Sequence, residues 1–113
     1  MKIYHNPRCR KSREGVQYLK DKGVDFEIVE YLKNNISEKV MKLLISKLGI
    51  SAIDLVRKNE QIWKDKYKNI ELTENQIIKL LINEPKLMER PIIESEFKAV
   101  IGRPKDNIGI LII

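Results

Sequence analysis

The stretch that decides the fold is YHNPRCRKSR at residues 4–13, where a short apolar strand gives way to a helix. It contains the one cysteine of the chain, Cys9. A sulfur at a helix N-terminus faces unpaired backbone N–H groups and the positive end of the helix dipole, and Arg8, Arg10 and Arg13 add positive charge. These effects favour the thiolate, whereas an inert, buried cysteine would normally have apolar neighbours. The stretch therefore predicts a reactive cysteine.

Length and composition indicate one small globular domain. The chain has 113 residues, of which 42% are hydrophobic and 34% are charged, enough for a single hydrophobic core. No apolar stretch is long enough to span a membrane and no signal peptide precedes the first strand, so we expect a cytoplasmic protein. With one cysteine no intramolecular disulfide is possible, and any redox cycle must use an external thiol.

The charge of the chain is basic, with a formal net charge of +6. The lysines are spread along the sequence without a basic helix or an aromatic-interleaved patch, so we do not expect nucleic acid as a partner. Only six of the 22 cationic residues are arginine, whose planar fork captures oxyanions in bidentate fashion. Three of the six arginines flank the cysteine, and the other three are Arg57, Arg90 and Arg103. Each of these three, taken alone, is also compatible with an ordinary surface or salt-bridge role.

The first third of the chain predicts a strand, a helix and a second strand. Residues 2–5 form the first strand, a helix follows over residues 10–22 with Leu19 on its inner face, and Gly23 ends it. Residues 26–31 form the second strand. A crossover of this length favours parallel pairing of the two strands with a right-handed connection.

The middle third predicts helices. Residues 37–49 form one, and its apolar residues recur at helical spacing: Val40, Leu43, Leu44 and Leu48. A short helix at residues 51–56 leaves Arg57 at its end. Thr73 and Gln76 form a capping box that opens a further helix.

The last third predicts a β-hairpin of residues 91–94 and 97–101, followed by a final helix with Pro104 in its first turn. The whole order predicts an α/β protein with a thioredoxin-like mixed sheet flanked by helices. We expect a single domain over residues 1–113, with an all-helical insertion at residues 37–88 inside it.

Four segments of the chain together resemble the glutaredoxin-coupled arsenate reductase family, in the same order over essentially the full length. They are residues 5–13, 55–59, 89–93 and 101–104. The resemblance implies a cytoplasmic enzyme that reduces arsenate or a similar oxyanion, with glutathione as co-substrate, glutaredoxin as partner and no tightly bound cofactor. A Cys-x-x-Ser motif is weak by itself, and it is the four segments in register that identify the family.

Roles for individual residues follow from the same resemblance. The cysteine matching Cys9 is the nucleophile, the histidine matching His5 helps to lower the thiol pKa, and Ser12 matches a hydroxyl near the sulfur. The proline matching Pro91 is expected to be cis. Three arginines are expected to hold the oxyanion: Arg57, Arg90 and Arg103.

Some residues near the cysteine allow two interpretations. Arg10 and Lys11 stand where the reductase pattern has small residues; they could tighten or crowd anion binding, although long side chains can project into solvent. His5 either polarises the thiol or packs at the strand end, because the sequence shows no acidic partner for it. Ser12 either donates to the thiolate or caps the helix, and capping is favoured. No grouping of Cys and His predicts a metal site.

Two other function classes remain open. One is an Spx-like regulator that binds RNA polymerase, and the other is a glutathione-dependent monothiol oxidoreductase. Most such regulators carry Cys-x-x-Cys as a redox switch, and a thiol–disulfide oxidoreductase more often has a second cysteine at position 12. This chain has Ser12 there, so among the oxidoreductases only the monothiol route is left. Convergence of the three arginines on Cys9 would favour the reductase, since a dianionic oxyanion and a thiolate need fixed cationic donors between them.

Overall fold

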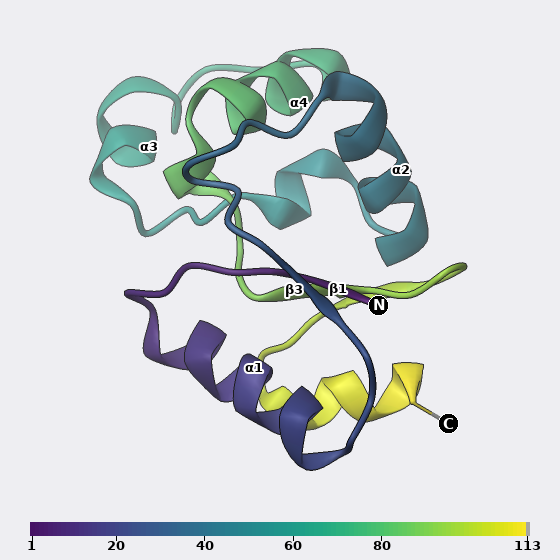
Figure 1. Cartoon of the computed structure of the whole chain (residues 1–113). Helices are drawn as coiled ribbons and strands as arrows, with labels where there is room; N and C mark the ends of the chain where they lie inside the picture. The colour runs from purple at the N-terminus through teal and green to yellow at the C-terminus, as the bar shows by residue number, and fades with distance from the viewer. Residues whose placement is uncertain (113) are drawn as a thin grey trace. The chain divides into compact units, whose positions relative to one another are not determined.

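The computed structural model describes residues 1–112, and the chain forms two compact units. The sheet unit comprises Met1–Asn34 and the chain from Arg90 onward, and the helical unit comprises Asn35–Glu89. The sheet unit contains β1 (Lys2–Tyr4), α1 (Arg10–Asp21), β2 (Glu27–Val29), β3 (Ile92–Glu94), β4 (Ala99–Ile101) and the 3₁₀ helix η3 (Lys105–Leu111) (Figure 1). The helical unit contains α2 (Glu38–Leu48), η1 (Ala52–Leu55), α3 (Gln61–Lys66), α4 (Glu74–Asn83) and η2 (Pro85–Leu87).

The sheet has four strands in the order β2-β1-β3-β4. β1 pairs with β2 in parallel, as predicted, with Tyr4 opposite Val29. β3 is antiparallel to both β1 and β4. The predicted α/β class and mixed, thioredoxin-like sheet are confirmed. Because of these strand directions, the end of β1, the beginning of β3 and the end of β4 meet at one edge of the sheet.

The core of the sheet unit lies between the strands and two helices. Ile3, Leu19, Ile93 and Ile108 are fully buried together, and Figure 1 shows α1 and η3 side by side along one face of the strands. Gly15 makes this close packing possible, because a Cβ atom there would lie 3.0 Å from Cγ of Pro91. The position of α1, and with it that of the residues at its start, is therefore fixed by the core.

The buried face of α2 differs from the predicted one. Val40 and Leu43 are 40% and 53% exposed, and the residues that α2 buries are Met41, Leu44 and Ile45. The sequence offers two apolar stripes that share Leu44, and packing within the helical unit selects the second. The ends of the helix are as predicted, because Ser37 caps it at the N-terminus and Gly49 ends it in the left-handed conformation.

The last predicted helix is a 3₁₀ helix that begins after Pro104. The peptide bond between Arg90 and Pro91 is cis, as expected, and the bond between Arg103 and Pro104 is cis as well. The sequence did not predict the second cis bond.

The helical unit holds Arg57 through its backbone. Val56 forms a bridge with Met88, and the N–H of Arg57 donates to the carbonyl of Leu87 at 2.6 Å. The predicted capping box of Thr73 and Gln76 is present at the start of α4. Among the helices of residues 1–112, we find none with the length and apolar character that crossing a membrane requires.

Candidate active site

Cys9 is the N-cap residue of α1, with extended backbone dihedrals of φ −93° and ψ 122°. Its N–H donates to the carbonyl of Asn6 and its own carbonyl accepts from the N–H of Arg13, both at 3.0 Å. The residue is only 8% exposed. The loop and the first turn therefore hold the sulfur where the unpaired N–H groups of the helix begin, as the sequence predicts.

The surroundings of the sulfur lower the pKa of Cys9. Burial by itself raises this pKa, but the backbone N–H of Ser12, the side chain and charge of Arg90, and the backbone N–H of Lys11 outweigh it. All of these groups stabilise the negative charge of the thiolate. These surroundings therefore favour the thiolate form of Cys9 over the thiol.

Two of the predicted oxyanion-binding arginines lie at this edge of the sheet. Arg103 places Nη2 4.0 Å from Sγ of Cys9, and Arg90 also acts on the sulfur through its side chain. Nε of Arg90 is buried and has no hydrogen-bond partner within residues 1–112. A buried donor of this kind is costly to leave unpaired, so it marks a place where an acceptor from a ligand would be stabilised.

The two arginines are brought together by the hairpin of β3 and β4. Arg90 directly precedes Pro91 and Arg103 directly follows Gly102, and the N–H of Gly102 donates to the carbonyl of Pro91 at 2.8 Å. A Cβ atom at Gly102 would lie 2.8 Å from Cδ1 of Ile93. Only glycine therefore allows the two segments to approach so closely.

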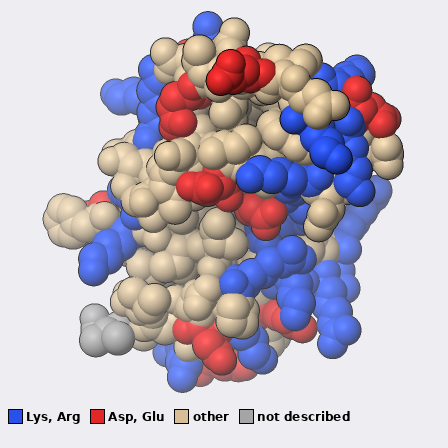
Figure 2. Space-filling view, turned by 180° about the vertical axis from the view of Figure 1, so that it is seen from behind, with Lys and Arg blue, Asp and Glu red and all other residues tan. Residues whose placement is uncertain are grey.

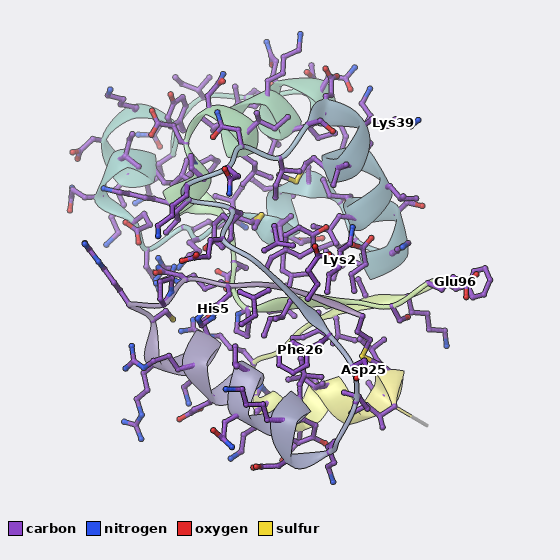
Figure 3. All side chains as sticks on the ribbon, in the orientation of Figure 1. Lys2, His5, Asp25, Phe26, Lys39 and Glu96 are labelled. Atoms are coloured by element: carbon purple, nitrogen blue, oxygen red, sulfur yellow. The ribbon has the colours of Figure 1, made fainter. Side chains whose placement is uncertain are left out.

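His5 and Ser12 form a buried pair beside the cysteine. Nδ1 of His5 lies 2.7 Å from Oγ of Ser12, and the N–H of Asn6 donates to the same oxygen at 3.0 Å. Figure 3 shows His5 between the end of β1 and the first turns of α1. The favoured prediction that the Ser12 hydroxyl caps the helix is wrong, because the hydroxyl joins α1 to the end of β1 and Cys9 occupies the N-cap. It is the backbone N–H of Ser12 that stabilises the sulfur.

Burial and neighbouring charges shift the pKa of His5, and the net effect lowers it. Burial lowers the pKa of His5 and the charge of Arg13 lowers it further, while Glu30 and the backbone bond with Ser12 raise it. Glu30 is the acidic partner that the sequence did not reveal. The parallel pairing of β1 and β2 explains this partner. The N–H of His5 donates to the carbonyl of Val29 at 2.9 Å, which brings Glu30, the residue after Val29, beside the histidine.

The cations that flank Cys9 in sequence do not have the predicted effect on its pKa. Arg8, Arg10 and Arg13 are exposed, and none of them is a cause of the lowered pKa of Cys9. Arg10 and Lys11 project into solvent, as the sequence allowed, and both pair with Glu14.

Arg57 belongs to the helical unit, where its guanidinium pairs with Glu60. Its contact with an oxyanion stays a prediction. Within residues 1–112 we find no group of three or more His, Cys, Asp or Glu side chains that could hold a metal ion. At this edge of the sheet unit, the sulfur of Cys9 lies next to the guanidinium groups of Arg90 and Arg103.

Known proteins resemble this chain over almost all of its length. An "Uncharacterized protein YfgD" of Escherichia coli is 42% identical over 96% of this chain and 92% of its own. A protein named "Arsenate reductase" of Neisseria meningitidis is 36% identical, covering 96% of this chain and 94% of its own. A solved structure, "Putative arsenate reductase from Yersinia pestis", is 38% identical with a TM-score of 0.90, covering 99% and 98% of the two chains. The model of the ArsC family matches residues 4–111, and the chain belongs to that family.

Proposed function

We propose that this protein reduces arsenate to arsenite, with Cys9 as the nucleophile. The observation that carries the proposal is the sulfur of Cys9, whose pKa is lowered by Arg90 and by helix N–H groups, next to a buried guanidinium N–H that has no partner within residues 1–112. A dianionic oxyanion needs such fixed donors before a thiolate can attack it. Relatives of similar length named arsenate reductase support the choice of arsenate as the oxyanion.

In the proposed reaction, the Cys9 thiolate attacks arsenic and a bond forms between Sγ and arsenic. One hydroxyl group of the arsenate takes up a proton from solvent and leaves as water. An external thiol then attacks Sγ, a disulfide forms, and the electron pair of the Sγ–arsenic bond stays on arsenic. Arsenic thereby changes from As(V) to As(III) and leaves as arsenite, while two thiols are oxidised. The chain has one cysteine, so the second thiol comes from outside. We propose glutathione for this role, glutaredoxin for reduction of the resulting mixed disulfide, and a cytoplasmic setting.

The proposal assigns oxyanion binding to Arg90 and Arg103 at the sulfur and to Arg57 as the third donor. Ser12 contributes its backbone N–H, and the His5–Ser12 pair positions the first turn of α1. Pro91 is a positioning residue, since it carries the backbone between Arg90 and β3.

The test is arsenite production by the purified protein supplied with arsenate, glutathione and glutaredoxin. We expect turnover that Cys9→Ala abolishes and that Arg90→Gln lowers by at least about 100-fold, the size of loss seen when one charge-stabilising donor is removed. Lys20→Gln, an exposed cation in the last turn of α1, is the matched control and should keep full activity. Equal turnover in Cys9→Ala would refute the proposal. Turnover of a glutathione mixed disulfide without any arsenite would instead support the monothiol oxidoreductase.

A further inference from the structure

The surface beside Cys9 carries a cluster of exposed cations that the proposed reaction leaves without a role. We call this cluster the cationic rim, and its members are Arg8, Arg10, Lys11 and Arg13. They belong to the loop before α1 and to its first turn, so the geometry of the chain keeps them close to the sulfur. Arg103, also exposed, reaches the same sulfur from beyond β4.

The positive charge of the rim is only partly neutralised. Between residues 8 and 14 the sequence has four cations and one carboxylate, Glu14. Arg10 and Lys11 share that carboxylate at 3.3 Å and 3.6 Å, and their side chains remain 83% and 52% exposed. Exposed pairs of this kind are weak and strongly hydrated. The rim therefore keeps a positive potential toward the solvent.

The charge of the rim is not a cause of the lowered pKa of Cys9. The pKa of Cys9 is lowered by the N–H of Ser12, by Arg90 and by the N–H of Lys11, which is a backbone group that any side chain would leave in place. The rim cations are exposed to solvent and lie within four residues of Cys9 along the chain, so their charge acts on a second reactant that approaches the sulfur. Such a field attracts anionic reactants and repels cationic ones.

We propose that the cationic rim recognises the reducing thiol and selects a slim thiol that carries carboxylate groups near its sulfur. Slimness follows from the small exposure of Cys9, 8%, because the attacking sulfur must enter a nearly closed site. The inference rests on the proposed function only for the need for an external thiol.

The experiment uses the full chain with Cys9 converted to a mixed disulfide with 2-nitro-5-thiobenzoate. An added thiolate attacks Sγ, a new S–S bond forms, and the probe leaves as a coloured thiolate whose absorbance gives the rate. No arsenate takes part, so failure of arsenate reduction and failure of thiol selection are separate results. The thiols are glutathione, which is anionic, 2-mercaptoethanol, which is neutral, and cysteamine, which is cationic. Each rate is divided by the rate of the same thiol on the N-acetylcysteine amide mixed disulfide, which removes differences in nucleophilicity.

We expect corrected rates in the order glutathione, 2-mercaptoethanol, cysteamine at low salt, with the differences shrinking at high salt. The double variant R10Q/K11Q should slow glutathione about three- to fivefold and leave 2-mercaptoethanol unchanged. E14Q removes the carboxylate and should speed glutathione about twofold. K20Q removes one positive charge in the last turn of α1 and should change no rate.

Equal corrected rates for the three thiols would overturn the proposal. Equal slowing of glutathione and 2-mercaptoethanol in R10Q/K11Q would overturn it too, because the cations would then be acting on Cys9 itself. Reduced glutaredoxin is run beside glutathione, and a dependence on the rim seen with glutaredoxin alone would show that the surface serves a protein thiol instead. Circular dichroism of each variant restricts the comparison to folded protein.

Discussion

At the scale of single residues, the site depends on hydrogen bonds of which the sequence predicts only a part. Cys9 and its position at the start of a helix could be predicted from residues 4–13, because a helix N-terminus follows from local spacing. The direction of the Ser12 hydroxyl could not, since it depends on where α1 lies relative to β1. The role of Glu30 beside His5 likewise depends on the register of two strands.

Ser12→Ala should destabilise the protein by about 1–3 kcal/mol, because it leaves the N–H of Asn6 and the ring of His5 without their shared partner. Urea unfolding followed by circular dichroism measures the loss. Ser46→Ala, at an exposed position of α2, is the control and should cost much less. Unchanged stability of Ser12→Ala would contradict the bonding described for the pair.

Glu30→Gln should lower the pKa of His5. The negative charge of Glu30 favours the imidazolium form and raises this pKa against burial and the charge of Arg13, so its removal acts in the opposite direction. Titration of the imidazole protons by NMR gives the midpoint. Glu96→Gln, at the exposed turn of the β3–β4 hairpin, should leave it in place, and a raised midpoint in Glu30→Gln would disprove the assignment.

At the scale of elements, helix ends were predictable and helix faces were less so. Ser37, Gly49 and the Thr73 capping box mark their helices through local chemistry, and the structure agrees with each. The prediction of the buried face of α2 was wrong because the sequence contains two overlapping apolar stripes. The hairpin of β3 and β4 was predicted, whereas its placement beside β1 depends on pairing between strands that are distant in sequence.

The corrected face of α2 makes a direct comparison possible. Leu44→Ala, at a fully buried position, should destabilise the protein by about 2–5 kcal/mol through the cavity that it leaves. Leu43→Ala, at the neighbouring exposed position, should change stability by no more than about 0.5 kcal/mol. Chemical unfolding measures the free energy of unfolding of both variants. A larger loss of stability for Leu43→Ala than for Leu44→Ala would support the buried face that the sequence predicted.

Gly15→Ala tests the packing of α1 on the sheet. Alanine favours a helix over glycine by about 1 kcal/mol, but its Cβ would meet Pro91 at 3.0 Å and Ile3 at 3.2 Å. Overpacking in a core costs about 1–3 kcal/mol, so we expect net destabilisation. Lys20→Ala on the exposed side of the same helix should not destabilise. A stabilised Gly15→Ala variant would mean that the helix can move away from the strands.

At the scale of the whole molecule, the protein combines the fold of its family with an excess of positively charged residues. Figure 2 shows Lys and Arg gathered mainly along one side of the view, with Asp and Glu among them, and the net charge of the chain is +6. The sequence predicted the sheet and its directions from the order of elements. It assigned Arg90 and Arg103 to the site only through the family resemblance, because nothing local in the sequence indicates that their segments meet at Cys9.

The central claim is that Arg90 and the first N–H groups of α1 lower the pKa of the Cys9 thiol. The most direct measurement is the rate of alkylation by iodoacetamide against pH, because only the thiolate reacts. For the wild type we predict a midpoint below that of an ordinary thiol, and for Arg90→Gln a higher midpoint, since a donor and a positive charge have been removed. Arg8→Gln, the matched loss of an exposed charge beside the cysteine, should shift it less. An ordinary midpoint in the folded wild type, or one that Arg90→Gln leaves unchanged, would contradict the claim.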